Sequence, residues 1–160
     1  MPITKHIIEQ IQKGHFGQSG VIQAVEGEFD VEVKMADCDR LGCLLNRLDL
    51  KRTDGGDLAL DPIQIVHQVT YLGERLEVIE TDRGTGRTIL RSSPPRIEGD
   101  IISFFEMVVD TAKGLSLVRY KYDCQVGERH NEPAPLTCDT VERLINDFIE
   151  LVRENSPSSQ

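Results

Sequence analysis

The stretch from residue 100 to residue 124 constrains the fold of this 160-residue sequence more than any other part. Two β-rich runs flank the five-residue segment 110–114 (DTAKG), an arrangement typical of a β-hairpin. The first run is apolar on both alternating sets of side chains, which is typical of a strand covered on both faces. We therefore predict a central hairpin in an antiparallel sheet. The apolar residues of its first strand are Ile101, Ile102, Phe104, Phe105, Met107, Val108 and Val109.

Two further hairpins are predicted from the alternation of apolar and polar residues. Residues 29–36 place apolar and charged side chains on opposite sides, which is typical of a half-buried strand, and residues 43–51 return after a turn. Residues 76–81 and 87–92 pair in the same way around a loop that contains glycine. In the strand 43–51 the side chains predicted to face inward are Leu44, Leu48 and Leu50.

Helices are predicted near both ends of the chain. Residues 3–13 carry isoleucine at every fourth position and are followed by a glycine, a residue common after helices. A second helix follows Thr137, whose hydroxyl can cap the first turn. In this helix Glu142, Asp147 and Glu150 are predicted to face away from the core. Its apolar stripe consists of Val141, Leu144, Ile145, Phe148, Leu151 and Val152.

Three segments are less regular. Residues 61–72 combine a helix-start signal, Asp61 followed by Pro62, with a β-branched run. We assign them to a strand because β-branched residues prefer strands and the odd-numbered apolar residues alternate. Residues 127–137 are polar and contain two prolines, which indicates a loop. Residues 14–20 contain three glycines, which indicates a flexible connector.

Together these elements predict an α+β fold. We expect an antiparallel β-meander of about seven or eight strands, forming a bent sheet or half-barrel, with an N-terminal helix and a C-terminal helix packed on the sheet. Hairpin connections without crossover helices exclude a parallel sheet. We expect residues 1–155 to form a single α+β domain, because 160 residues suit one core, and residues 156–160 to form a disordered tail.

Charge and composition exclude some partners and favour one compartment. A net charge of −9 at pH 7 argues against nucleic-acid binding, because affinity for a phosphate backbone comes from clustered cations. No run approaches the roughly 20 apolar residues of a membrane span, and the N-terminus lacks the apolar segment of a signal peptide. We therefore expect a cytoplasmic protein that binds neither membrane nor nucleic acid, with its four cysteines reduced.

The cysteines are the first candidates for chemistry. Cys38 and Cys43 flank a four-residue turn and are expected to face each other, while Cys124 and Cys138 bracket a loop that contains His130. The functional alternatives are a zinc site and a reactive Cys138 thiol at the start of a helix. However, the spacing is looser than that of a typical zinc knuckle, and acidic residues adjoin Cys138. Because no catalytic motif is present either, we predict no metal, no cofactor and no catalytic residue.

One histidine and several cations are the candidates for ligand binding. His67 shares a side of its predicted strand with apolar neighbours, where it is either a core residue or a base in a cavity. Arg87 and Arg91 share one side of a strand, and Arg119 and Lys121 share one side of another. If these two strands are neighbours, the four cations form a patch that binds a small anionic ligand. The alternative is cross-strand ion pairing. The carboxylates in reach for such pairing are Glu77, Glu106 and Asp123.

Two functions fit this inventory better than an enzyme does. The first, which we favour, is a non-enzymatic protein-interaction or adaptor module that forms a homodimer or binds another protein. The second is a small-molecule-binding, barrel-like domain in which the sheet curls around the helix and encloses an Arg-lined or apolar pocket. An enclosed pocket would favour the second function. The side chains predicted to line it are Phe104, Met107, Tyr120, Tyr122 and Phe148.

Overall fold

The structure is a computed structural model that describes residues 2–14 and 20–155. Most of the predicted connector and the whole predicted tail lie outside the described residues. The described elements are, in order, α1 Ile3–Gln12, β1 Val21–Glu26, β2 Phe29–Cys38, β3 Gly42–Arg52, α2 Pro62–Gln68, β4 Leu76–Asp82, β5 Arg87–Ser92, β6 Arg96–Glu98, β7 Ile101–Asp110, β8 Gly114–Asp123, β9 Glu128–Asn131, β10 Ala134–Thr137 and α3 Cys138–Asn155.

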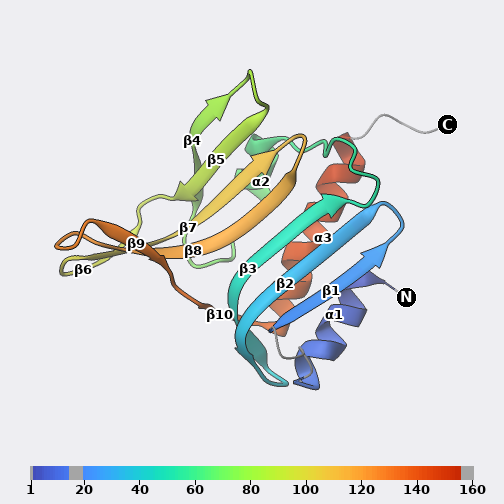
Figure 1. The fold of residues 1–160 in the computed structure, drawn as a ribbon, viewed down its shortest axis with the longest axis horizontal. Helices are drawn as coiled ribbons and strands as arrows, with labels where there is room; N and C mark the ends of the chain where they lie inside the picture. The colour runs from blue at the N-terminus through green and yellow to red at the C-terminus, as the bar shows by residue number, and fades with distance from the viewer. Residues whose placement is uncertain (1, 15–19, 156–160) are drawn as a thin grey trace.

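All ten described strands belong to one antiparallel sheet, which stays open (Figure 1). The main order is β1-β2-β3-β8-β7-β5-β4, with β10 paired to β3, β6 to β7 and β9 to β8. The predicted α+β class is confirmed, and β7 is central, as predicted, because β5 and β8 flank it. After the first three strands the chain passes through α2 and the β4–β5 hairpin, so that β3 pairs with β8 and not with β4.

Both terminal helices pack on one side of the sheet. α1 and α3 contact each other and cover the same side of β1, β2 and β3, and α2 packs beside β4 and α3 (Figure 1). The side chains of the predicted α3 stripe are all buried, and the Thr137 hydroxyl accepts a hydrogen bond from the backbone N–H of Thr140 at 3.2 Å. The predicted helix and its cap are therefore confirmed. In the described part of the chain no helix covers the other side of the sheet, which we call the open face.

The inward side of β3 differs from the prediction at Leu44. The register between β2 and β3 shifts at Met35, so that Asn46 is left as an extra residue between Leu45 and Arg47. A bulge of this kind reverses which alternating set faces the core. Leu45 is therefore buried and Leu44 is exposed, whereas Leu48, beyond the bulge, is buried as predicted.

Residues 61–72 do not form the predicted strand. Residues 62–68 are the helix α2, in which the Asp61 side chain accepts a hydrogen bond from the backbone N–H of Ile63 at 2.9 Å. Pro62 stands at the first helical position, where its missing N–H costs nothing. The cap thus outweighs the β-branched composition of the run. Ile65 in α2 and Val69 just after it are four residues apart, and both side chains are fully buried.

The segment 127–137 contains two short strands and not only a loop. β9 pairs with the end of β8, and β10 pairs with the start of β3. Pro135 is compatible with β10 because this strand has a pairing partner on one edge only, which is where proline occurs in sheets. Through β10 the chain crosses from the open end of the β7–β8 hairpin back to α3 (Figure 1).

One predicted surface carboxylate of α3 is buried. The Asp147 side chain accepts hydrogen bonds from the Tyr71 hydroxyl at 2.6 Å and from the Gln68 amide at 3.2 Å. Burial, followed by this hydrogen bond to Asp147, raises the pKa of Tyr71 well above its usual range. Asp147 therefore joins α3 to the end of α2, and the prediction that it faces away from the core is wrong.

Candidate functional site

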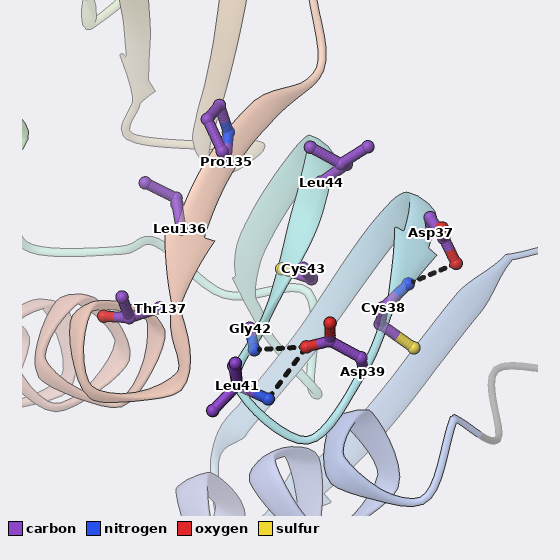
Figure 2. Close-up of a pocket in the computed structure, with 10 residues that line it drawn as sticks. All are labelled: Asp37, Cys38, Asp39, Leu41, Gly42, Cys43, Leu44, Pro135, Leu136 and Thr137. Atoms are coloured by element: carbon purple, nitrogen blue, oxygen red, sulfur yellow. Dashed lines mark hydrogen bonds between the residues drawn. The ribbon is translucent and has the colours of Figure 1, made fainter.

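A concave, largely apolar pocket lies at the turn between β2 and β3, where β10 runs alongside (Figure 2). We call it the hairpin-end pocket. Its volume is about 290 Å³. Two segments that are distant in the sequence form it, namely the β2–β3 hairpin over residues 37–44 and the end of β10 over residues 135–137. It is lined by Asp37, Cys38, Asp39, Leu41, Gly42, Cys43, Leu44, Pro135, Leu136 and Thr137.

Asp39 and Gly42 give the pocket its shape. The Asp39 Oδ1 atom accepts hydrogen bonds from the backbone N–H groups of Leu41 and Gly42, at 2.8 and 3.1 Å, and so fixes the turn (Figure 2). A Cβ atom at residue 42 would overlap the carbonyl oxygen of Leu136. Glycine is therefore required there, because β10 must approach β3 this closely to form the wall of the pocket.

The walls of the pocket expose leucine side chains to solvent. Leu41 at the tip of the turn is 72% exposed, and Leu44 on β3 is 38% exposed. Pro135 stands opposite Leu44 in the sheet, and Figure 2 shows it beside that leucine. The carboxylate of Asp37 lies at the rim, where its only hydrogen bond with a described residue is the one that it accepts from the backbone N–H of Cys38. The pocket therefore suits an apolar side chain flanked by a positive charge.

The two thiols that line this pocket, Cys38 and Cys43, and the thiol of Cys138 at the start of α3 are protonated at neutral pH. Burial, and then the neighbouring thiols of Cys138 and Cys38, raises the pKa of Cys43 to about 12. The pKa values of Cys38 and Cys138 are raised as well, first by burial and then by nearby aspartates. A thiolate nucleophile at the start of α3 is therefore not supported, because the acidic neighbours oppose it. The described residues contain no group of three or more His, Cys, Asp or Glu side chains placed to hold a metal ion.

Cys38 and Cys43 are directly opposite in the register, as the sequence predicted. The backbone N–H of Asp39 donates to the carbonyl of Gly42 at 2.9 Å, so the next pair, Cys38 and Cys43, is a non-hydrogen-bonded pair. The Cα atoms of such pairs lie about 4.5 Å apart, at the lower end of the range for disulfides. The register therefore permits a cross-strand disulfide.

We predict that the thiol oxidant diamide joins Cys38 to Cys43. The two thiols lose two hydrogen atoms to diamide, which becomes the hydrazine, and one S–S bond forms. Because the pKa values of both thiols are raised, the rate should increase with pH. Mass spectrometry of peptides after digestion identifies the linkage, and Cys124→Ser is the control that retains it. Linkage of Cys124 in place of this pair would contradict the prediction.

The predicted patch of four cations does not exist as one surface. β7 separates β5 from β8, so the strands that carry these residues are not neighbours. Arg91 stands opposite Glu106, whereas Arg119 stands opposite Phe105, and consecutive residues of β7 point to opposite faces. Arg87 and Arg91 are therefore on the open face. Arg119 and Lys121 are on the side of the helices.

Arg119 is a buried structural residue and not a free ligand-binding cation. Its guanidinium donates two hydrogen bonds to the carboxylate of Glu74, at 3.1 and 2.9 Å, and lies 3.7 Å from Glu132. The same group lies 4.7 Å from the centre of the Phe105 ring. Arg91 is also ion-paired, because its Nε atom donates a hydrogen bond to Glu106 at 2.8 Å. Cross-strand ion pairing was the predicted alternative to a ligand-binding patch.

The other predicted binding residues are dispersed. His67 is exposed on α2, so its predicted place among apolar residues is wrong. Met107 and Phe148 are fully buried in the core, whereas Phe104 and Tyr120 pack against each other on the open face, with ring centres 6.0 Å apart. These side chains therefore do not line a common cavity.

The residues that form the actual cavities gave weak signals in the sequence. Leu41 stands in a polar turn, and Pro135 stands in a stretch that resembles a loop. An apolar residue at a hairpin tip, where solvation favours polar side chains, is a signal that could have identified the pocket.

Comparison with known proteins adds no assignment. No family model, no curated protein and no solved structure matches this chain. Within residues 2–14 and 20–155, no helix has both the length and the apolar character that a membrane crossing requires.

Proposed function

We propose that this protein is a non-enzymatic interaction module that associates through the hairpin-end pocket, and that its partner is a second copy of the chain. The observation that carries this proposal is the exposure of Leu41, at 72%, beside a pocket of about 290 Å³ with apolar walls. A projecting apolar side chain and an apolar recess adjoin on one surface. In a twofold dimer such a surface is self-complementary, because Leu41 of each copy enters the pocket of the other.

The charges around the pocket are also complementary under a twofold axis. Arg40 at the tip of the turn is exposed and has no ion-pair partner among the described residues, and Asp37 at the rim has no cationic partner there. In a dimer, Arg40 of one copy can meet Asp37 of the other. Because such rim pairs are solvated, they favour the correct orientation more than they increase affinity.

The expected dimer is reversible. Burial of one leucine side chain contributes about 1.5–3 kcal/mol, so two symmetric insertions contribute about 3–6 kcal/mol. Association costs about 4 kcal/mol or more in lost translational and rotational freedom. The net free energy of dimerisation is therefore small. The proportion of dimer should therefore depend on protein concentration and should decrease at high salt, since screening weakens the pairs between Arg40 and Asp37.

Sedimentation velocity over a series of protein concentrations tests the proposal. We expect the wild-type protein to form dimers as concentration rises and Leu41→Asp to remain monomeric at the same concentrations. Ile97→Asp is the matched control, because Ile97 on β6 is 65% exposed and lies outside the pocket. A wild-type protein that remains monomeric throughout would overturn self-association. Equal loss of dimer in both variants would assign the interface to another surface.

A further inference from the structure

The open face carries a second cavity, lined by arginine side chains from three strands. Arg47 comes from β3, Arg87 from β5 and Arg129 from β9, although β7 and β8 lie between the first two strands. We call this the open-face cavity, and its volume is about 210 Å³. Its lining residues are Arg47, Arg87, Glu106, Val108, Ser116, Val118, Tyr120 and Arg129.

A buried carboxylate fixes part of this cavity. Glu106 is 5% exposed, and its Oε2 atom accepts hydrogen bonds from Arg91 at 2.8 Å and from Arg129 at 2.9 Å. Burial alone would raise the pKa of Glu106, but the two arginines outweigh burial and lower it. The guanidinium of Arg129 also lies 4.0 Å from the centre of the Tyr120 ring. Arg129 is therefore held in place before any ligand arrives, which reduces the entropic cost of binding.

The arginines at the cavity exceed the carboxylates that pair with them. Glu106 pairs with Arg91 and Arg129, and Asp49 accepts hydrogen bonds from the Nε atom of Arg47 at 3.0 and 2.9 Å. Arg87 has no ion-pair or hydrogen-bond partner for its side chain among the described residues. The lining of the cavity itself holds three arginines and one carboxylate, Glu106, in a chain whose net charge is −9.

Two more carboxylates stand near Arg87 and keep their negative charge, although turn backbone N–H groups donate hydrogen bonds to them. Asp82 and Asp110 are opposite Arg87 on the neighbouring strands. Asp82 accepts hydrogen bonds from backbone N–H groups of the β4–β5 turn, and Asp110 accepts them from the β7–β8 turn. Both line the hollow next to the cavity and not the cavity itself.

We propose that the open-face cavity binds a phosphate group. Guanidinium groups match phosphate oxygens with paired N–H donors, and here they approach from three strands, which suits a tetrahedral anion better than a planar carboxylate. A phosphate group carries a charge of about −1.5 to −2 near neutral pH, so it is attracted more strongly by the three guanidinium groups of the lining than a singly charged anion is. Ser116 supplies a hydroxyl donor in the same lining. The site is independent of the proposed dimerisation, because the two cavities share no residue.

Titration with inorganic phosphate, followed by calorimetry at constant ionic strength with chloride as the balancing anion, tests this site. We expect saturable binding by the wild-type protein and a roughly tenfold or greater loss of affinity in Arg87→Gln, because one guanidinium contact to phosphate is lost. Arg83→Gln is the matched control. Arg83 is exposed in the β4–β5 turn, four residues before Arg87 and outside the cavity. Its replacement removes the same charge as Arg87→Gln does.

Each outcome decides the proposal. Absence of saturable binding, or equal weakening in Arg87→Gln and Arg83→Gln, would show that phosphate only screens surface charge and would overturn it. Tighter binding of malonate, whose two charged groups are planar carboxylates, than of phosphate would overturn the assignment to phosphate. Because the side chain of Arg87 has no hydrogen-bond or ion-pair partner in the part of the chain that the structure describes, Arg87→Gln should retain the thermal unfolding midpoint of the wild-type protein, so that lost affinity is not explained by misfolding.

Discussion

Replacement of Arg119 by alanine is expected to lower the free energy of unfolding by about 3–5 kcal/mol, because a buried ion pair loses one partner. The remaining carboxylate of Glu74, whose side chain is 16% exposed, would have no cation, and Glu132 would lose its nearest positive charge. The guanidinium that covers Phe105 would also be lost. The effect should therefore exceed that of an ordinary surface ion pair, which contributes at most about 1 kcal/mol.

Urea unfolding followed by circular dichroism measures this loss. Arg87→Ala is the matched control, because it removes an open-face arginine whose side chain has no hydrogen-bond or ion-pair partner in the described ranges 2–14 and 20–155. Its effect should be within about 0.5 kcal/mol. A similarly small effect of Arg119→Ala would contradict the structural role assigned to Arg119. It would reopen the possibility that this side chain is available to a ligand.

Asp147→Ala is expected to lower the free energy of unfolding by about 2–3 kcal/mol, because hydrogen bonds to a charged group are lost at a buried position. The Tyr71 hydroxyl and the Gln68 amide both donate to this carboxylate. Glu150→Ala is the control on the same helix, since Glu150 is exposed and has no hydrogen-bond or ion-pair partner within residues 2–14 and 20–155. Equal effects of the two substitutions would show that Asp147 does not join α3 to α2.

The same contact predicts a dependence of stability on alkaline pH. The pKa of Tyr71 is raised in the folded protein, first by burial and then by Asp147, above its value of about 10 in an unfolded chain. The stability that Tyr71 contributes is therefore fully present below pH about 10 and is lost as pH rises towards its folded-state pKa. Unfolding measured between neutral and alkaline pH should show this loss in the wild-type protein and a smaller one in Asp147→Ala.

The sequence was sufficient to predict the elements whose local pattern and tertiary role agree. The alternation in β2 and the stripe of α3 each describe burial directly, and both predictions are confirmed. The doubly apolar pattern of β7 correctly predicted its central place in the sheet, but Phe104 and Val108 on the open face are only half-buried, because no described helix covers that side. The prediction failed at α2, where local rules conflict. There the Asp61 cap and Pro62 favour a helix while the β-branched residues favour a strand, and the cap prevails because it satisfies a backbone N–H that would otherwise lack a partner.

The candidate sites were less predictable because they depend on pairing between distant strands. The alternation of side chains along each strand was compatible with Arg91 and Arg119 lying in one patch. In the structure β7 lies between their strands, and the register places the two side chains on opposite faces of the sheet. Leu44 was placed inward because a bulge at Asn46 leaves no clear mark in an apolar run. Asp147 was placed outward because a helical period cannot reveal that α2 packs over that position.

The contact between the β2–β3 turn and the start of α3 has a consequence for folding. The backbone N–H of Cys138 donates to the carbonyl of Leu41 at 3.0 Å, and the Cys138 thiol lies 3.8 Å from the carbonyl of Arg40, 98 residues away in sequence. Contacts of such separation require closure of a long loop, so they form late and slow the folding reaction. The hairpin-end pocket is thus assembled only when the chain has closed almost completely. A partner that binds there would therefore bind the fully folded protein and not partly folded forms.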